Sequence, residues 1–118
     1  VSENDWKHYI SERTKLILVT HLLGSRNPLD ALFQLAEQYH IPVVEDCAQA
    51  HGAEYKKKMV GSFGIAGCYS FYANKIISSG EGGLIATNSD SIFKKLQNRI
   101  VINRFGTNWI KITNRCAY

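Results

Sequence analysis

Two apolar runs on either side of one amphipathic segment limit the fold of this chain more than any other feature. Residues 15–22 form a continuous run with β-branched members, typical of a strand covered on both faces in a parallel sheet, and residues 42–46 predict a second buried strand. Between them, Asn27 followed by Pro28 predicts a helix start, because asparagine caps a helix and proline suits its first position. Pro42 disfavours helical geometry before it, so the helix is expected to end near His40. Strand, helix and strand within about 32 residues predict a βαβ unit with parallel strands, and therefore an α/β fold.

The middle of the chain adds more strands. Residues 53–61 are predicted to form a small surface hairpin whose tip carries the lysines at 56–58. Residues 67–72 are apolar and predict another buried strand, and residues 83–88 predict a further short one. We therefore expect a mainly parallel sheet with flanking helices.

Two further helical signals lie toward the ends of the chain. The spacing of Trp6, Tyr9 and Ile10 predicts the end of a short helix. Ser89 and Asp90 are capping residue types, and they precede an apolar helix face made by Ile92, Phe93, Leu96 and Ile100. Residues from 103 onward show no periodicity and are expected to be loop.

Composition excludes several classes of protein. With 118 residues, 45% hydrophobic and 20% charged, the chain suits one core and one domain. The net charge of +4 is scattered rather than gathered in a basic stripe, so no nucleic-acid partner is expected. No apolar run reaches the roughly 18 residues of a membrane helix and no leader opens the chain, so we expect a soluble protein without a membrane partner. Three cysteines without paired spacing suggest free thiols and a cytoplasmic location.

Lys75 and Asp46 are the candidate functional pair. Lys75 follows an apolar strand and precedes Gly80, Gly82 and Gly83, while Asp46 closes the strand at 42–46. Ligands of parallel α/β sheets bind at the carboxyl ends of the strands, and a lysine amine there can form a Schiff base with a carbonyl. The plainer alternatives are a surface lysine and an aspartate that caps the turn following it.

Other kinds of site find less support. The histidines, at positions 8, 21, 40 and 51, are not at metal-ligand spacing with the cysteines, so no metal site is predicted. The glycines at 80–83 precede a strand rather than open a helix, unlike a dinucleotide-binding fingerprint. Cys47, beside Asp46, fits a core cysteine better than a reactive thiol.

Four segments in order resemble the DegT/StrS family of pyridoxal-phosphate (PLP) sugar aminotransferases. They are VEDCAQAHGA at 44–53, VGSFG at 60–64, YSFYANK at 69–75 and GEGG at 80–83, and the resemblance covers about residues 11–105. It implies a fold type I PLP-dependent transferase, of which residues 1–118 would be part of the large, cofactor-binding domain. The family's upstream segment and its small C-terminal domain are expected to be absent from this chain.

The resemblance also implies a role for each matching residue. Lys75 would bind PLP covalently as a Schiff base and later shuttle the substrate proton. Asp46 would pair with the pyridine nitrogen, Gln49 would contact the phenolic oxygen of the ring, and Ser70 would bind the phosphate. Related sugar dehydratases carry histidine in place of this lysine, so Lys75 favours transamination. The implied reaction moves an amino group from an amino acid, with glutamate expected, to a nucleotide-linked keto-sugar in amino-sugar or polysaccharide biosynthesis, and the implied assembly is a homodimer.

Departures from the family pattern leave two alternatives open. Ile65 stands where the family has aspartate, which removes a local turn bond, and Lys57 stands where glycine turns the hairpin. The stretch at 103–106 matches only loosely. With the missing flanks, these departures leave a non-transaminating, PLP-binding regulatory relative or an inactive truncated remnant as the alternatives to an enzyme.

Overall fold

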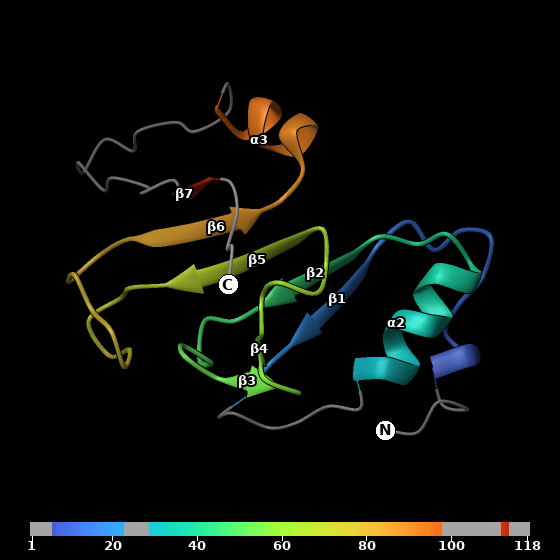
Figure 1. Cartoon of the computed structure of the whole chain (residues 1–118), viewed down its shortest axis with the longest axis horizontal. Coiled ribbons are helices and arrows are strands. Elements are labelled where there is room, and N and C mark those ends of the chain that lie inside the picture. The colour runs from blue at the N-terminus through green and yellow to red at the C-terminus, as the bar shows by residue number, and fades with distance from the viewer. Residues whose placement is uncertain (1–5, 23–28, 98–111, 114–118) are drawn as a thin grey trace.

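The computed structural model describes residues 6–22, 29–97 and 112–113 of the chain, and the backbone only at 97, 112 and 113. In this part the chain forms one five-stranded sheet in the order β1-β2-β5-β6-β7 and a separate two-stranded hairpin, β3-β4 (Figure 1). The sheet strands are β1 (Ile17–Thr20), β2 (Val43–Asp46), β5 (Ala66–Ser70), β6 (Gly83–Thr87) and β7 (Ile112–Thr113). No helix within the described ranges has the length and apolar character that crossing a membrane requires.

The βαβ prediction is confirmed. β1 and β2 pair in parallel with Ile17 opposite Val43, and α2 (Leu29–Gln38) connects them. This helix buries one apolar stripe, because its inward residues repeat three and four positions apart. They are Leu29, Leu32, Leu35 and Ala36. The predicted starting pair, Asn27 and Pro28, lies outside the described residues.

The end of α2 has a defined geometry close to the predicted position. His40 adopts a left-handed φ of 53° just after the helix ends at Gln38. The N–H of Ile41 donates to the carbonyl of Ala36 at 2.8 Å, and the N–H of His40 donates to that of Glu37 at 3.0 Å. This pair of bonds is a Schellman motif, which satisfies carbonyls that the helix itself leaves unpaired.

The sheet is mixed, with mainly parallel strands. β2 pairs in parallel with β5, β5 pairs antiparallel with β6, and β6 pairs in parallel with β7. The α/β prediction is therefore confirmed. The expectation that all residues from 103 onward form loop is wrong for Ile112 and Thr113, which pair with Ala86 and Thr87. Two residues are too short a run to show a strand periodicity. They form a strand because they pair with the edge of β6 that β5 leaves unpaired.

The predicted hairpin is confirmed as β3 (Glu54–Tyr55) and β4 (Lys58–Met59). Its two turn residues, Lys56 and Lys57, both have left-handed φ values, of 50° and 64°. That is the conformation of a two-residue hairpin turn for which glycine and asparagine are favoured. The lysine that replaces glycine at position 57 therefore occupies a strained turn.

The second helix, α3 (Asp90–Gln97), begins where the capping residues predict. The N–H of Ile92 donates to the hydroxyl oxygen of Ser89 at 3.4 Å, and the N–H of Phe93 donates to the Ser89 carbonyl at 2.9 Å. Ser89 is thus the N-cap. Ile100, the last expected residue of its apolar face, lies outside the described residues. At the other end of the chain, the spacing of Trp6, Tyr9 and Ile10 predicts the end of a short helix; Trp6 is helical, but Tyr9 lies in the turn that follows and Ile10 in irregular backbone.

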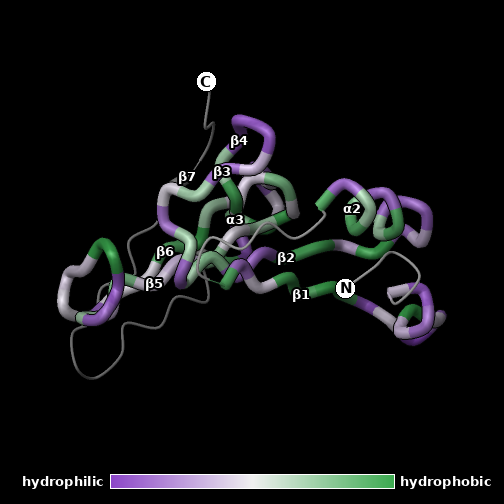
Figure 2. The backbone as a smooth tube through the Cα atoms, turned by 90° about the horizontal axis from the view of Figure 1, so that it is seen from below, coloured by the Kyte–Doolittle hydropathy of each residue, from purple (hydrophilic) through white to green (hydrophobic). Residues whose placement is uncertain are grey.

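The two faces of the sheet differ. α2 and the β3-β4 hairpin lie on the same side of β1 and β2 (Figure 2). Val19 of β1 and Val43 of β2 pack with α2 in the core on that side. Leu18 points to the other face and is 63% exposed, so the expectation that this strand is covered on both faces is wrong for the described part of the chain. Because side chains alternate along a strand, Glu45 faces the covered side and Asp46 faces the open side.

Candidate active site

The carboxyl ends of three neighbouring parallel strands form the candidate site. Thr20 of β1 is in register with Asp46 of β2, which is in register with Cys68 of β5. Register partners in parallel strands point to the same face, as does Ser70, two residues beyond Cys68. Asp46 and Ser70 are therefore separated by one strand spacing of about 4.8 Å and two residues of about 3.3 Å each along the strand. The sheet thus brings together two of the residues that the sequence singles out.

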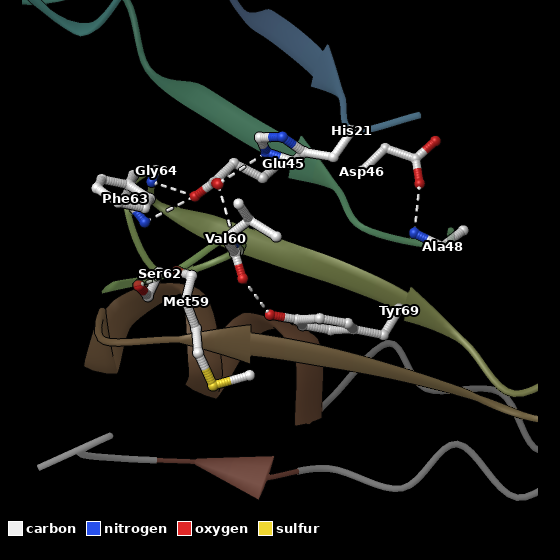
Figure 3. Close-up of polar contacts among 11 residues, drawn as sticks. His21, Glu45, Asp46, Ala48, Met59, Val60, Ser62, Phe63, Gly64 and Tyr69 are labelled. Carbon is white, nitrogen blue, oxygen red and sulfur yellow. Dashed lines mark hydrogen bonds and ion pairs between the residues drawn. The ribbon is translucent and has the colours of Figure 1, made fainter. Parts of the chain in front are cut away.

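Asp46 uses one carboxylate oxygen to cap a turn. Its Oδ1 accepts the N–H of Ala48 at 3.0 Å, and the N–H of Ala50 donates to the carbonyl of Cys47 at 3.0 Å. The turn-capping alternative for Asp46 is therefore present in the structure. In Figure 3 the second carboxylate oxygen points away from Ala48, and within the described ranges it has no hydrogen-bond partner. Asp46 can cap this turn and still accept a bond from a ligand.

Gln49 lies at the exposed part of the same turn. It follows Asp46 by three residues, and its side chain is exposed beyond the end of β2. The turn that Asp46 caps also determines where Gln49 lies, since both belong to residues 46–50.

Lys75 lies in a loop that begins where β5 ends. The loop is closed at its base, because the N–H of Phe71 donates to the carbonyl of Gly82 at 2.9 Å. Within it, the N–H of Lys75 donates to the carbonyl of Tyr72 at 2.9 Å, and the Lys75 side chain is half-buried. Gly80 and Gly82 have φ values of 82° and 139°, which confirms that the glycine cluster makes tight turns.

The pairing of Lys75 with Asp46 stays a prediction. Neither residue forms an ion pair with another residue of the described ranges 6–22, 29–97 and 112–113. Ser70 is also nearly free: its hydroxyl oxygen accepts only a long bond of 3.4 Å from the N–H of Tyr72. All four predicted residues therefore have polar atoms to offer at the carboxyl ends of β2 and β5.

Glu45 is the residue that sequence reasoning missed. It is 0% exposed, and Figure 3 shows its carboxylate on the opposite side of β2 from Asp46. Its oxygens contact His21 and three backbone N–H groups of the segment 61–64. A glutamate inside an apolar strand was the available signal, because a buried carboxylate needs hydrogen-bond partners.

The cluster of His21, Glu45 and Cys47 resembles a metal site in composition but not in chemistry. The possible ligand atoms lie within 4.8 Å of one another and all three residues are buried. Both Glu45 oxygens already accept N–H groups. Burial, and then the Glu45 charge, raise the pKa of the Cys47 thiol to about 12. The cluster is a hydrogen-bonded part of the core.

Cys47 and Cys68 are free thiols, as predicted, and Cys116 lies outside the described residues. Cys68 is on the open face beside Asp46. Burial, followed by the Asp46 charge, raises its pKa as well. Both described thiols are therefore held in their neutral form, and neither is an activated nucleophile.

Comparisons with known proteins give consistent matches. The chain is 43% identical over 89 residues to L-glutamine:2-deoxy-scyllo-inosose aminotransferase from Micromonospora echinospora, covering 75% of this chain and 21% of that protein. The structure matches an aminotransferase from Psychrobacter cryohalolentis with a TM-score of 0.78 and 38% identity, covering 82% of this chain and 25% of the other.

A solved structure with a bound cofactor also matches. It is an E. coli GDP-4-keto-6-deoxy-D-mannose-3-dehydratase with bound hydrated PLP, with a TM-score of 0.73, 28% identity and coverage of 82% of this chain and 25% of that one. The chain thus spans about a quarter or less of the length of these relatives. The family model of the DegT/DnrJ/EryC1/StrS aminotransferases matches residues 1–115. With nearly its whole length matched, the chain belongs to the DegT/DnrJ/EryC1/StrS aminotransferase family.

Proposed function

We propose that this chain carries the PLP-binding centre of an aminotransferase that delivers an amino group to a nucleotide-linked keto-sugar. The observation that carries the proposal is the shared open face at the carboxyl ends of β2 and β5. It holds the free oxygen of Asp46 and the hydroxyl of Ser70, and the loop with Lys75 begins at the same edge. Residues 1–118 would then be part of the large domain of such an enzyme.

The residues present fit this cofactor by their chemistry. A carboxylate suits a pyridinium nitrogen, a hydroxyl suits a phosphate, and a primary amine suits an aldehyde. Asp46, Ser70 and Lys75 supply these groups, and none is committed to another ionic partner among the described residues. The exposed amide of Gln49 can donate to the phenolic oxygen of the ring. When bound, PLP supplies an electron sink for the carbon that loses its proton.

In this proposal Asp46, Lys75 and Ser70 each have a distinct role toward the cofactor. Asp46 keeps a proton on the pyridine nitrogen with its free oxygen while its other oxygen holds the turn. The amine of Lys75 would hold the aldehyde and, once released, would accept the proton from the amino-bearing substrate carbon and donate it to the former aldehyde carbon of the cofactor. Ser70 donates to the phosphate from the end of β5. We propose glutamate as the amino donor.

The proposal is tested by adding PLP to the protein expressed from its complete coding sequence. We expect a visible absorbance of lysine-bound PLP that is lost in Lys75→Ala and kept in Lys95→Ala, a matched change on the exposed face of α3. Absence of this absorbance from the unmodified protein, or its persistence in Lys75→Ala, would reject the assignment. Amine transfer from glutamate or glutamine to a keto-sugar nucleotide then separates an enzyme from a PLP-binding regulatory relative or an inactive remnant.

We also propose a cytoplasmic homodimer. The free thiols of Cys47 and Cys68 suit a reducing compartment. Directly after Lys75, Ile76 and Ile77 are 79% and 57% exposed, and a second subunit would remove this apolar surface from water. Size-exclusion chromatography with light scattering would give the mass of a monomer if this part of the proposal is wrong.

A further inference from the structure

We infer that Glu45 is a positioning residue that holds Asp46 in place from beneath the sheet. The inference rests on the proposed function, since it assigns Glu45 a role through the residue proposed to contact the pyridine nitrogen. Glu45 and Asp46 are consecutive in β2 and face opposite sides of the sheet. Any shift of the Glu45 backbone therefore moves the Asp46 carboxylate as well.

The Glu45 carboxylate has a complete set of hydrogen-bond donors. Its Oε2 accepts the N–H of Gly61 at 2.7 Å and lies 3.0 Å from Nε2 of His21. Its Oε1 accepts the N–H groups of Phe63 and Gly64, both at 2.7 Å (Figure 3). Such short bonds to a charged acceptor are the strong class of protein hydrogen bond. Together they orient both oxygens of a side chain that water does not reach.

The segment 61–64 can supply these donors only because it approaches the strands so closely. A Cβ atom on Gly64 would lie 2.3 Å from the carbonyl oxygen of Val43, and one on Gly61 would lie 2.1 Å from the hydroxyl of Tyr69. Gly61 also has a φ of 88°, which favours glycine. The glycines of the VGSFG segment thus allow the backbone N–H groups of residues 61–64 to reach the Glu45 carboxylate.

His21 links the Glu45 carboxylate directly to the backbone of Asp46. Its imidazole contacts the Glu45 carboxylate, and its backbone N–H donates to the carbonyl oxygen of Asp46 at 2.9 Å. His21 is 2% exposed, so both contacts are made in the core. Segment 61–64, Glu45, His21 and the end of β2 therefore form one connected network. Loss of its central carboxylate would leave several buried N–H groups without an acceptor and release the end of β2.

If Glu45 served only the stability of the fold, its loss would lower the melting temperature without affecting cofactor binding. Two other measurements therefore distinguish a positioning role from a purely structural one. The first is the dissociation constant of PLP from the full-length protein. The second is the 15N chemical shift of the pyridine nitrogen in 15N-labelled PLP, which reports directly whether a carboxylate keeps that nitrogen protonated. Neither depends on turnover.

We expect Glu45→Gln to raise the PLP dissociation constant about tenfold. This is the lower end of the loss in metal affinity found when a residue that orients a metal-binding side chain is replaced. The pyridine 15N shift should move toward that of the unprotonated ring, and Glu45→Asp should recover part of both changes. Glu54→Gln, an exposed glutamate of β3, is the matched control and should change neither. Hydrogen exchange at Gly61, Phe63 and Gly64 should accelerate in Glu45→Gln.

The inference is overturned if Glu45→Gln lowers the melting temperature but leaves both cofactor readouts unchanged. If that variant does not fold, Glu45→Asp decides by the same two readouts, because its shorter side chain withdraws the carboxylate from the three backbone N–H groups of segment 61–64. Unchanged readouts in Glu45→Asp would then reject the inference. Failure of the proposed function looks different: the unmodified protein would show no lysine-bound PLP at all.

Discussion

Glu45 and Asp46 are adjacent carboxylates with opposite surroundings. Glu45 is fully buried and accepts N–H groups with both oxygens, whereas Asp46 is half-buried and uses one oxygen to cap a turn. The alternation of side chains along β2 causes this difference, because it directs one carboxylate under the segment 61–64 and the other to the open face. The pair therefore combines an anchor for the strand with a group that can still bind a ligand.

Asp46→Asn should abolish most turnover with little effect on folding. The asparagine oxygen can still accept the Ala48 N–H, so the capped turn should survive and the free energy of unfolding should change by less than about 0.5 kcal/mol. Loss of the charge should lower kcat by at least about a hundredfold, the scale found for removing one electrostatic stabiliser. Steady-state kinetics with urea unfolding as the control measure both. Unchanged turnover would contradict the role of Asp46.

Ser70→Ala should weaken PLP binding, whereas Ser62→Ala should lower the stability of the fold. The Ser70 hydroxyl makes only a long bond inside the protein, so its loss should weaken PLP binding by roughly 1.5–3 kcal/mol while stability is kept. The Ser62 hydroxyl donates to the Met59 carbonyl at 2.5 Å, so its loss should reduce stability by about 1 kcal/mol without affecting PLP. Fluorescence titration with PLP and urea unfolding separate the two. Equal PLP affinity in both variants would remove Ser70 from the site.

Lys57→Gly should stabilise the protein. Lys57 has a φ of 64° in the hairpin turn, and a left-handed conformation costs a residue with a Cβ roughly 1 kcal/mol. Part of this gain is offset by the greater freedom of glycine in the unfolded chain, so we expect about 0.5 kcal/mol. Lys58→Gly, in β4, should instead destabilise, because Lys58 lies over the Phe63 ring at 4.6 Å. A urea midpoint for Lys57→Gly below that of the unmodified protein would contradict the prediction.

Gly64→Ala should be much more harmful than Gly52→Ala. The new Cβ at 64 would collide with the Val43 carbonyl oxygen, so we expect a loss of about 2–3 kcal/mol from forced backbone movement. At Gly52 the space is open and only its φ of 73° opposes a side chain, so about 1 kcal/mol should be lost. Thermal unfolding of the two variants gives the comparison. Similar losses would show that segment 61–64 is not pressed against β2.

The Cys47 thiol should make stability depend on pH in the alkaline range. Burial raises its pKa from 9.0 to about 12, so above pH 9 the unfolded chain releases a proton that the folded chain retains. The contribution is fully present below pH 9 and is lost as the pH rises from 9 toward 12. We expect urea midpoints to fall more steeply over this range in the unmodified protein than in Cys47→Ala. Parallel pH dependences would refute this prediction.

Local signals in the sequence predicted most of the helices and strands, but not β7. The Asn27-Pro28 pair and Pro42 bracket α2, the polar run at 53–61 predicts the hairpin, and Ser89 marks the start of α3. Each depends on neighbours in the chain, which is why sequence reasoning succeeds there. β7 was missed because two residues carry no periodicity and gain their partner only from the edge of β6.

The sequence by itself determined the βαβ unit, the α/β class and the family, because these depend on short-range periodicity and on motifs read in order. Only the tertiary structure decided which carboxylate is buried and which is available. That choice depends on contacts between β2, His21 and segment 61–64, which are distant in the chain and meet through strand pairing. The same pairing places Asp46 and Ser70 on one face, since register sets the direction of every side chain in a sheet.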